Sequence, residues 1–107
     1  MNTRITGFAK PITWLTGLST GWGNGYAVIP EGHKFHGKHY DEIDVNVHGG
    51  LTFSSAADEL DWPEITDEHK GGWVVGFDCA HYGDTPETCP EEYVKAEVES
   101  LIKQLTN

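Results

Sequence analysis

The sequence predicts an α+β domain, in which a small antiparallel sheet carries a C-terminal amphipathic helix packed on one face. Two observations predict this class: strand-like segments separated by glycine-rich or polar turns come first, and a single segment of helical periodicity comes last. The 107 residues suit one domain, 1–107, whose modest core draws on four Trp, four Tyr and four Phe.

The N-terminal third predicts little regular structure before one strand. Glycines and a proline interrupt any helix in the first twenty residues, so we expect a loop with a short strand around residues 12–16. Residues 21–25 (GWGNG) predict a glycine-rich turn. Residues 26–29 (YAVI) are β-prone and end at Pro30, which predicts a strand, and a polar stretch follows over 31–41.

The middle of the chain predicts a hairpin. Residues 43–48 (IDVNVH) alternate apolar and polar side chains at period two, the clearest strand signal in the sequence. Gly49 and Gly50 then favour a turn, and residues 51–54 (LTFS) are expected to return as the partner strand. Residues 55–70 are acidic and predict a loop with a helical turn.

The C-terminal third predicts a central strand and the helix. Residues 73–78 (WVVGFD) are almost continuously apolar, as in a strand buried on both faces, and 82–89 follow as a loop. Thr88 is expected to cap the helix, with Pro90 in its first turn and Glu91 completing a capping box. The predicted apolar stripe consists of Val94, Val98, Leu101 and Leu105.

The charge balance narrows the classes of partner. Seven Lys+Arg against seventeen Asp+Glu give a formal charge of −10, which argues against general nucleic-acid binding and against attachment to an anionic membrane. No apolar stretch approaches the ~20 residues of a membrane span, and no secretory signal is visible. We therefore expect a cytoplasmic protein in which Cys79 and Cys89 are reduced thiols, with a disulfide between them as the less favoured alternative.

Ionisable side chains follow the predicted central strand. Asp78, His81 and Asp84 come at three-residue intervals, where a rigid sheet could hold a functional loop. Together with His48 they would form a mixed nitrogen and oxygen ligand set for a divalent metal such as zinc, iron or manganese, although the spacing matches no zinc signature. The alternatives are a polar ligand pocket, or a His48 ring that merely bonds a backbone carbonyl.

Two other features bear on a site. Cys79 could act as a nucleophile beside His81, although a buried cysteine is more often a small apolar residue. Aromatic side chains could stack on a flat ligand or simply fill the core. These aromatic candidates are Trp22, Tyr26, Phe53, Trp73 and Tyr82.

A local basic patch lies between the first two strong strand signals. Residues 32–41 (GHKFHGKHYD) hold three histidines and two lysines in an otherwise acidic chain. Lys34, Lys38 and His33 could hold a phosphate or carboxylate group. The alternative is an exposed loop whose polar side chains have no such role.

Three segments together resemble a group of small phage and prophage proteins. They are residues 23–33 (GNGYAVIPEGH), 48–53 (HGGLTF) and 76–84 (GFDCAHYGD), and the resemblance covers about residues 22 to 105. It implies a small accessory protein in the host-cell cytoplasm, with a role against host defence through a nucleotide signal or a host protein. It implies no mechanism.

Three functions follow, in order. The first is binding of a small anionic or nucleotide-like ligand, in a closed pocket or a homo-oligomeric interface that shields it from the negative field. The second is a metal-dependent hydrolase with one carboxylate as general base. The third is an acidic protein-interaction or DNA-mimic surface. The candidate ligand-binding residues are His33, Lys34, Lys38, His48, Gly49, Gly50, Thr52, Asp78, His81 and Asp84.

Overall fold

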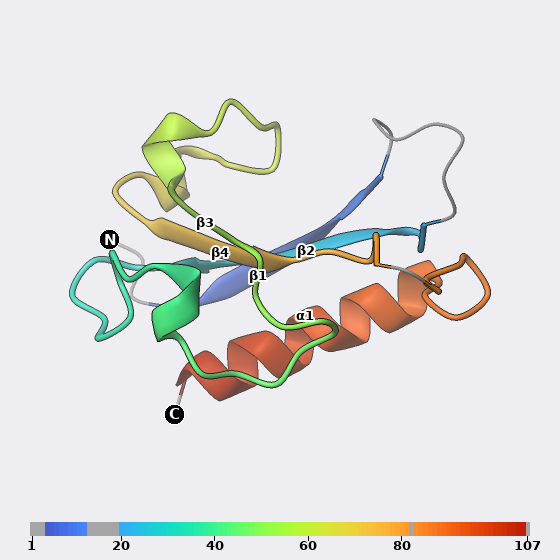
Figure 1. Ribbon diagram of the computed structural model, residues 1–107. Coiled ribbons are helices and arrows are strands. Elements are labelled where there is room, and N and C mark those ends of the chain that lie inside the picture. The colour runs from blue at the N-terminus through green and yellow to red at the C-terminus, as the bar shows by residue number, and fades with distance from the viewer. Residues whose placement is uncertain (1–3, 13–19, 82, 107) are drawn as a thin grey trace.

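In the computed structural model, a four-stranded antiparallel sheet has one long helix packed against it (Figure 1). The structure describes residues 4–12, 20–81 and 83–106. The predicted α+β class is confirmed. The sheet order is β1-β2-β4-β3. The elements are β1 (Thr6–Pro11), β2 (Gly23–Ile29), η1 (Tyr40–Glu42), β3 (Phe53–Ala56), η2 (Ala57–Glu59), η3 (Asp67–His69), β4 (Trp73–Phe77) and α1 (Glu91–Thr106).

The centre of the sheet is built from β2 and β4, as their apolar character predicts. β2 begins at Gly23, however, so a turn over residues 23–25 is the wrong prediction. Glycine is used in this strand because its neighbours leave no space for a side chain. A Cβ on Gly25 would collide with the Phe77 ring, and one on Gly23 would collide with the Lys10 carbonyl oxygen.

The first strand lies earlier than predicted. β1 pairs with β2 from Thr6↔Val28 to Pro11↔Gly23, and Ile12 already lies outside it. Residues 13–16 of the predicted strand lie outside the described residues. Gly7 suits an edge strand that the helix covers closely, because a Cβ there would meet Val98 Cγ1 at 2.7 Å.

The helix packs on one face of the sheet through the predicted stripe: Val94, Val98, Leu101 and Leu105 are buried. Its predicted cap is wrong. Thr88 exchanges hydrogen bonds with Thr85 in the preceding turn, and the first helical bond runs from Val94 N–H to the Pro90 carbonyl. The Thr85–Thr88 turn satisfies the hydroxyl groups before the helix begins.

Residues 43–48 are not a strand, and the predicted hairpin is wrong. The segment runs extended along α1, where Ile43 and Val47 enter the same core as the helix. Gln104 brackets Asn46, accepting from its backbone N–H at 2.7 Å and donating to its carbonyl at 3.0 Å. The alternation is real, but its buried face lies against a helix, and β3 pairs with β4 instead.

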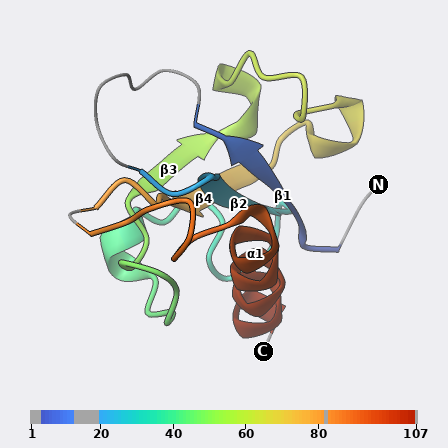
Figure 2. The same ribbon diagram turned by 90° about the vertical axis from the view of Figure 1, so that its right-hand side faces the viewer.

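The other face of the sheet is covered by the loop between β3 and β4 (Figure 2). As predicted, this acidic stretch contains helical turns, η2 and η3. It packs Ala57 and Trp62 over Tyr26 and Val74 in a second cluster. Within the described residues, no helix has the length and apolar character that a membrane span requires.

Candidate metal centre

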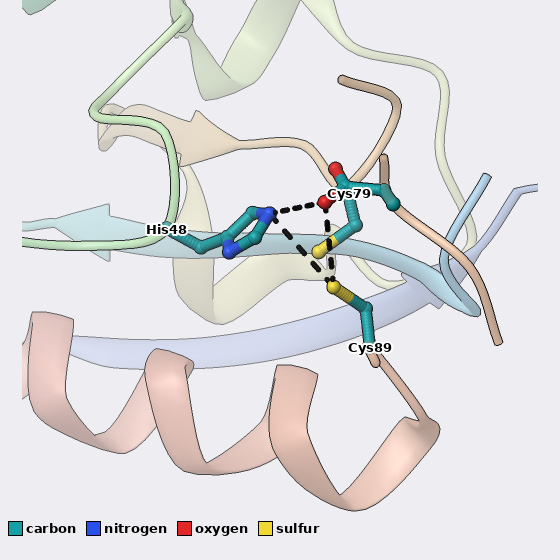
Figure 3. Close-up of side chains that lie close together, drawn as sticks. His48, Cys79 and Cys89 are labelled. Carbon is teal, nitrogen blue, oxygen red and sulfur yellow. Dashed lines mark hydrogen bonds and ion pairs between the residues drawn. The ribbon is translucent and has the colours of Figure 1, made fainter. Parts of the chain in front are cut away.

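Four ligand-type side chains converge beside the N-terminal end of α1. His48 comes from the segment that lies along the helix, Cys79 follows β4, Asp84 lies in the next turn, and Cys89 lies two residues before the start of α1. Their ligand atoms all lie within 4.8 Å of one another. In Figure 3 the His48 ring and both cysteine sulfur atoms point toward one another from three different segments.

Three separations among these atoms are close to those of a coordination shell. His48 Nε2 lies 2.9 Å from Asp84 Oδ1, and Cys89 Sγ lies 3.8 Å from the same nitrogen and 3.6 Å from the same oxygen. Zinc bonds of about 2.0–2.3 Å in a tetrahedron separate neighbouring ligand atoms by roughly 3.3–3.8 Å. One ion would fit here if the His48–Asp84 contact opened by roughly a few tenths of an ångström and the Cys79 sulfur, which lies within 4.8 Å of the other three ligand atoms, moved toward them.

The cluster is buried on its sulfur side. Cys79 and Cys89 are 0% and 1% exposed and are free thiols, as predicted, while the His48 side chain is 21% exposed. Burial, and then the adjacent Cys89, raise the pKa of Cys79 well above its usual value. A bound divalent cation would supply the missing charge and hold the thiols as thiolates.

Asp84 is fixed by the backbone of its own turn. Its Oδ2 accepts the His81 N–H at 2.9 Å, and its own N–H donates to the His81 carbonyl at 2.9 Å. Although burial raises the pKa of Asp84, the His81 N–H and the His48 ring outweigh it, so the pKa lies below its usual value. Oδ1 is thereby presented to the centre as a carboxylate oxygen.

His48 is fixed by α1. Its backbone N–H donates to Glu97, and its Nδ1 lies 2.9 Å from the Tyr93 hydroxyl oxygen. When Nδ1 carries the ring proton and donates it to Tyr93, Nε2 presents a lone pair to the centre. Outer partners of this kind orient the histidine ligands of metal sites.

The two cysteines are brought together by the segment before β2. Gly21 N–H donates to the Cys79 carbonyl at 2.7 Å, and Trp22 N–H donates to the Cys89 carbonyl at 2.8 Å. A Cβ on Gly21 would lie 2.5 Å from Cys89 Cβ and 2.8 Å from Cys79 Cβ. Only glycine leaves room for both cysteines at this point.

The same geometry does not favour cysteine nucleophilic catalysis. In a catalytic triad the imidazole uses one nitrogen for the nucleophile and the other for the carboxylate. Here Asp84 and Cys89 both face Nε2 of His48, and Tyr93 occupies Nδ1. This convergence of the Asp84, Cys89 and His48 side chains is typical of ligands around a metal ion.

The remaining residues of the predicted metal set lie outside the four-residue cluster. His81 is bracketed by two carboxylates, with Nε2 3.5 Å from Asp78 and Nδ1 3.5 Å from Asp84. Thr52 donates to Asp78 at 3.0 Å, and Gly49 lies against the His81 ring, where a Cβ would meet Nε2 at 2.8 Å. These groups form the exposed rim of the centre.

The basic loop lies elsewhere. His33 Nε2 bonds the Leu105 carbonyl at the last turn of α1, whereas His48 bonds Tyr93 at its first turn. Twelve residues of helix separate these positions by about 18 Å. Lys34 and Lys38, both exposed, belong to this far loop, so the structure does not bring it together with His48 (Figure 1).

Among the described aromatic candidates, Trp22 borders the cluster, because its backbone N–H donates to the Cys89 carbonyl. Trp22 and Trp73 pack against the helix-side core, and Tyr26 and Phe53 belong to the opposite face of the sheet. Tyr82 lies outside the described residues.

In comparisons with known proteins, no family model, no curated protein and no solved structure matches the chain.

Proposed function

We propose that this chain is a metal-binding protein whose centre holds one zinc ion through His48, Cys79, Asp84 and Cys89. The observation that carries the proposal is the convergence of four ligand atoms within 4.8 Å from segments that are otherwise separate. Two sulfur atoms, one imidazole and one carboxylate suit zinc, whereas magnesium and calcium prefer oxygen ligands. The formal charge of −10 also favours uptake of a cation.

The ligand set supports a structural role for the ion. Four protein ligands complete a tetrahedral zinc site, while hydrolytic zinc sites keep a position open for water. The ion would join the His48 segment, the turn after β4 and the start of α1. A structural centre is therefore a better account of the geometry than the metal-dependent hydrolase that the sequence also suggests.

Metal analysis of the untagged protein tests the proposal. We expect one zinc per chain after purification without chelator, and tetrahedral cobalt spectra with a thiolate charge-transfer band after exchange into Co²⁺. Zinc should also raise the free energy of unfolding, by about 2.7 kcal/mol at a free concentration 100-fold above Kd. Substoichiometric zinc together with a cobalt spectrum lacking the thiolate band would overturn the proposal.

Matched variants assign the ligands. His48→Ala and Cys89→Ser should lose stoichiometric zinc, whereas His33→Ala should retain it, because His33 bonds only the far end of α1 and its own loop. The variant His81→Ala distinguishes this ligand set from the alternative set of His48, Asp78, His81 and Asp84. Full zinc binding by that variant supports the cysteine-containing set, and its loss supports the other.

A further inference from the structure

Two buried thiols lie side by side in the proposed centre, because both sulfur atoms belong to the group of ligand atoms that lie within 4.8 Å of one another. A Cβ on Gly21 would lie 2.5 Å from Cys89 Cβ and 2.8 Å from Cys79 Cβ. The two cysteine Cβ atoms can be no farther apart than those two distances taken together. A disulfide needs a Cβ separation of about 3.5–4.5 Å, so a shift of at most about 1 Å brings the two cysteines within range.

We propose that hydrogen peroxide oxidises metal-bound Cys79 and Cys89 to a disulfide, and that the ion is then released. This inference rests on the proposed function, because the metal supplies the thiolates that react. The protein would thereby convert exposure to peroxide into loss of its metal.

The chemistry balances with peroxide as the oxidant. One thiolate sulfur attacks a peroxide oxygen, the O–O bond breaks, and the departing hydroxide takes up a proton to form water; the sulfur is left as a sulfenic acid. The second thiolate attacks that sulfur, forms the S–S bond and expels hydroxide, which takes up another proton. Overall two thiolates, one peroxide and two protons give one disulfide and two waters.

Burial selects the class of oxidant. Cys79 and Cys89 are 0% and 1% exposed, so a bulky disulfide such as oxidised glutathione cannot align with either sulfur. The centre is open at His48 and at the neighbouring rim residue His81, whose side chains are 21% and 37% exposed. We expect hydrogen peroxide, a molecule of two oxygen atoms, to reach the sulfur atoms from this side.

Loss of the ion would loosen the segment that carries His48. Without the metal, the described contacts of this segment with α1 are hydrogen bonds to Tyr93, Glu97 and Gln104 and the packing of Ile43 and Val47. The oxidised state should therefore differ from the zinc-loaded state over residues 43–50. Oxidation of the two cysteines would thereby change the surface that residues 43–50 form beside α1.

The test follows zinc and thiols together in the zinc-loaded full chain. Hydrogen peroxide should release zinc to a chromophoric chelator, with loss of two hydrogens per chain by mass spectrometry and a Cys79–Cys89 crosslink on peptide mapping. Dithiothreitol with added zinc should reverse all three changes. Oxidised glutathione at equal concentration should act at least about tenfold more slowly, because both thiols are buried.

Two controls separate the possible failures. Cys79→Ser should form no intramolecular disulfide, and metal-free His48→Ala, which retains both cysteines, should still form it, more slowly. A chain that binds no zinc before oxidant is added, and that shows no thiolate band with Co²⁺, overturns the proposed function. A zinc-loaded chain that keeps its ion in peroxide, or loses it while the sulfurs become separate sulfinic acids, overturns the redox inference alone.

Discussion

Nε2 of His48 lies 2.9 Å from Oδ1 of Asp84, so a side chain from the segment along α1 meets one from the turn that follows β4. Each partner is independently fixed, His48 by Tyr93 and Asp84 by the His81 N–H. The contact brings together residues 36 apart in the sequence and defines the centre before any metal enters. The contact between His48 and Asp84 should therefore persist in the metal-free protein, where its effect on stability can be measured.

Acid should destabilise the metal-free protein through Asp84. Its pKa is lowered in the folded state, so its stabilising contribution is present above the unfolded value of about 3.9 and is lost as pH falls through the folded-state pKa. Asp84→Asn should flatten this acid dependence of the free energy of unfolding. Urea titrations in chelator at a series of pH values check it. Asp41 forms an exposed pair with His39 at 3.6 Å, so the control Asp41→Asn should leave the acid dependence of the free energy of unfolding unchanged. An unaltered acid dependence in Asp84→Asn would contradict the role given to Asp84.

Tyr93→Phe should weaken zinc binding without unfolding the chain. The ring that packs edge-on against His48 remains, but the oxygen that holds Nδ1 is lost. Loss of such an outer partner typically reduces metal affinity by about 10–100-fold. Competition against a zinc chelator measures the change. Tyr40→Phe, in η1 away from the centre, is the matched control, and equal affinities for the two variants would argue against the role of Tyr93.

Gln104→Ala should release the segment that carries His48 at one end. Its side chain makes two hydrogen bonds to the backbone of Asn46, worth about 0.5–1.5 kcal/mol each in net stability. Amide hydrogen exchange should accelerate over residues 43–48 more than in β4. Glu99→Ala, an exposed position on the same helix, is the control. Uniform acceleration across the sheet would indicate global destabilisation instead.

The sequence was sufficient for the fold class because hydrophobic periodicity records burial. The apolar stripe of α1 and the apolar run of β4 are both buried in the structure, as predicted. Residues 43–48 show the limit of the same signal. Period-two alternation identifies an extended chain with one buried face, but it does not say whether a strand or a helix covers that face.

The centre was half visible in the sequence. His48 and Asp84 stand out because they are ionisable groups at turns, and they meet. The sequence indicates reduced thiols at Cys79 and Cys89, and Cys79 alone is interpreted further, as a nucleophile or a small buried residue. Their meeting depends on the Gly21–Trp22 backbone bonding both cysteine carbonyls, a contact made across more than fifty residues of sequence. Local patterns carry no information on such a bridge.

Gly21→Ala tests that bridge. The new Cβ would lie 2.5 Å from Cys89 Cβ and 2.8 Å from Cys79 Cβ, so the two cysteines must move apart. Overpacking of this kind typically costs about 1–3 kcal/mol, and we expect a similar loss of unfolding free energy together with weaker zinc binding. Denaturant titration and chelator competition measure the two effects.

Gly37→Ala is the matched control for Gly21→Ala. At Gly37 a Cβ would meet nothing within 4 Å, but φ is +82°, so alanine there carries the left-handed backbone strain alone, about 1–2 kcal/mol. It should lower stability and leave zinc affinity as in the unaltered chain. Gly21→Ala should lower both, because it acts on the spacing of the two sulfur ligands. Equal zinc affinity in the two variants would mean that Gly21 sets the stability of the turn and not the geometry of the centre.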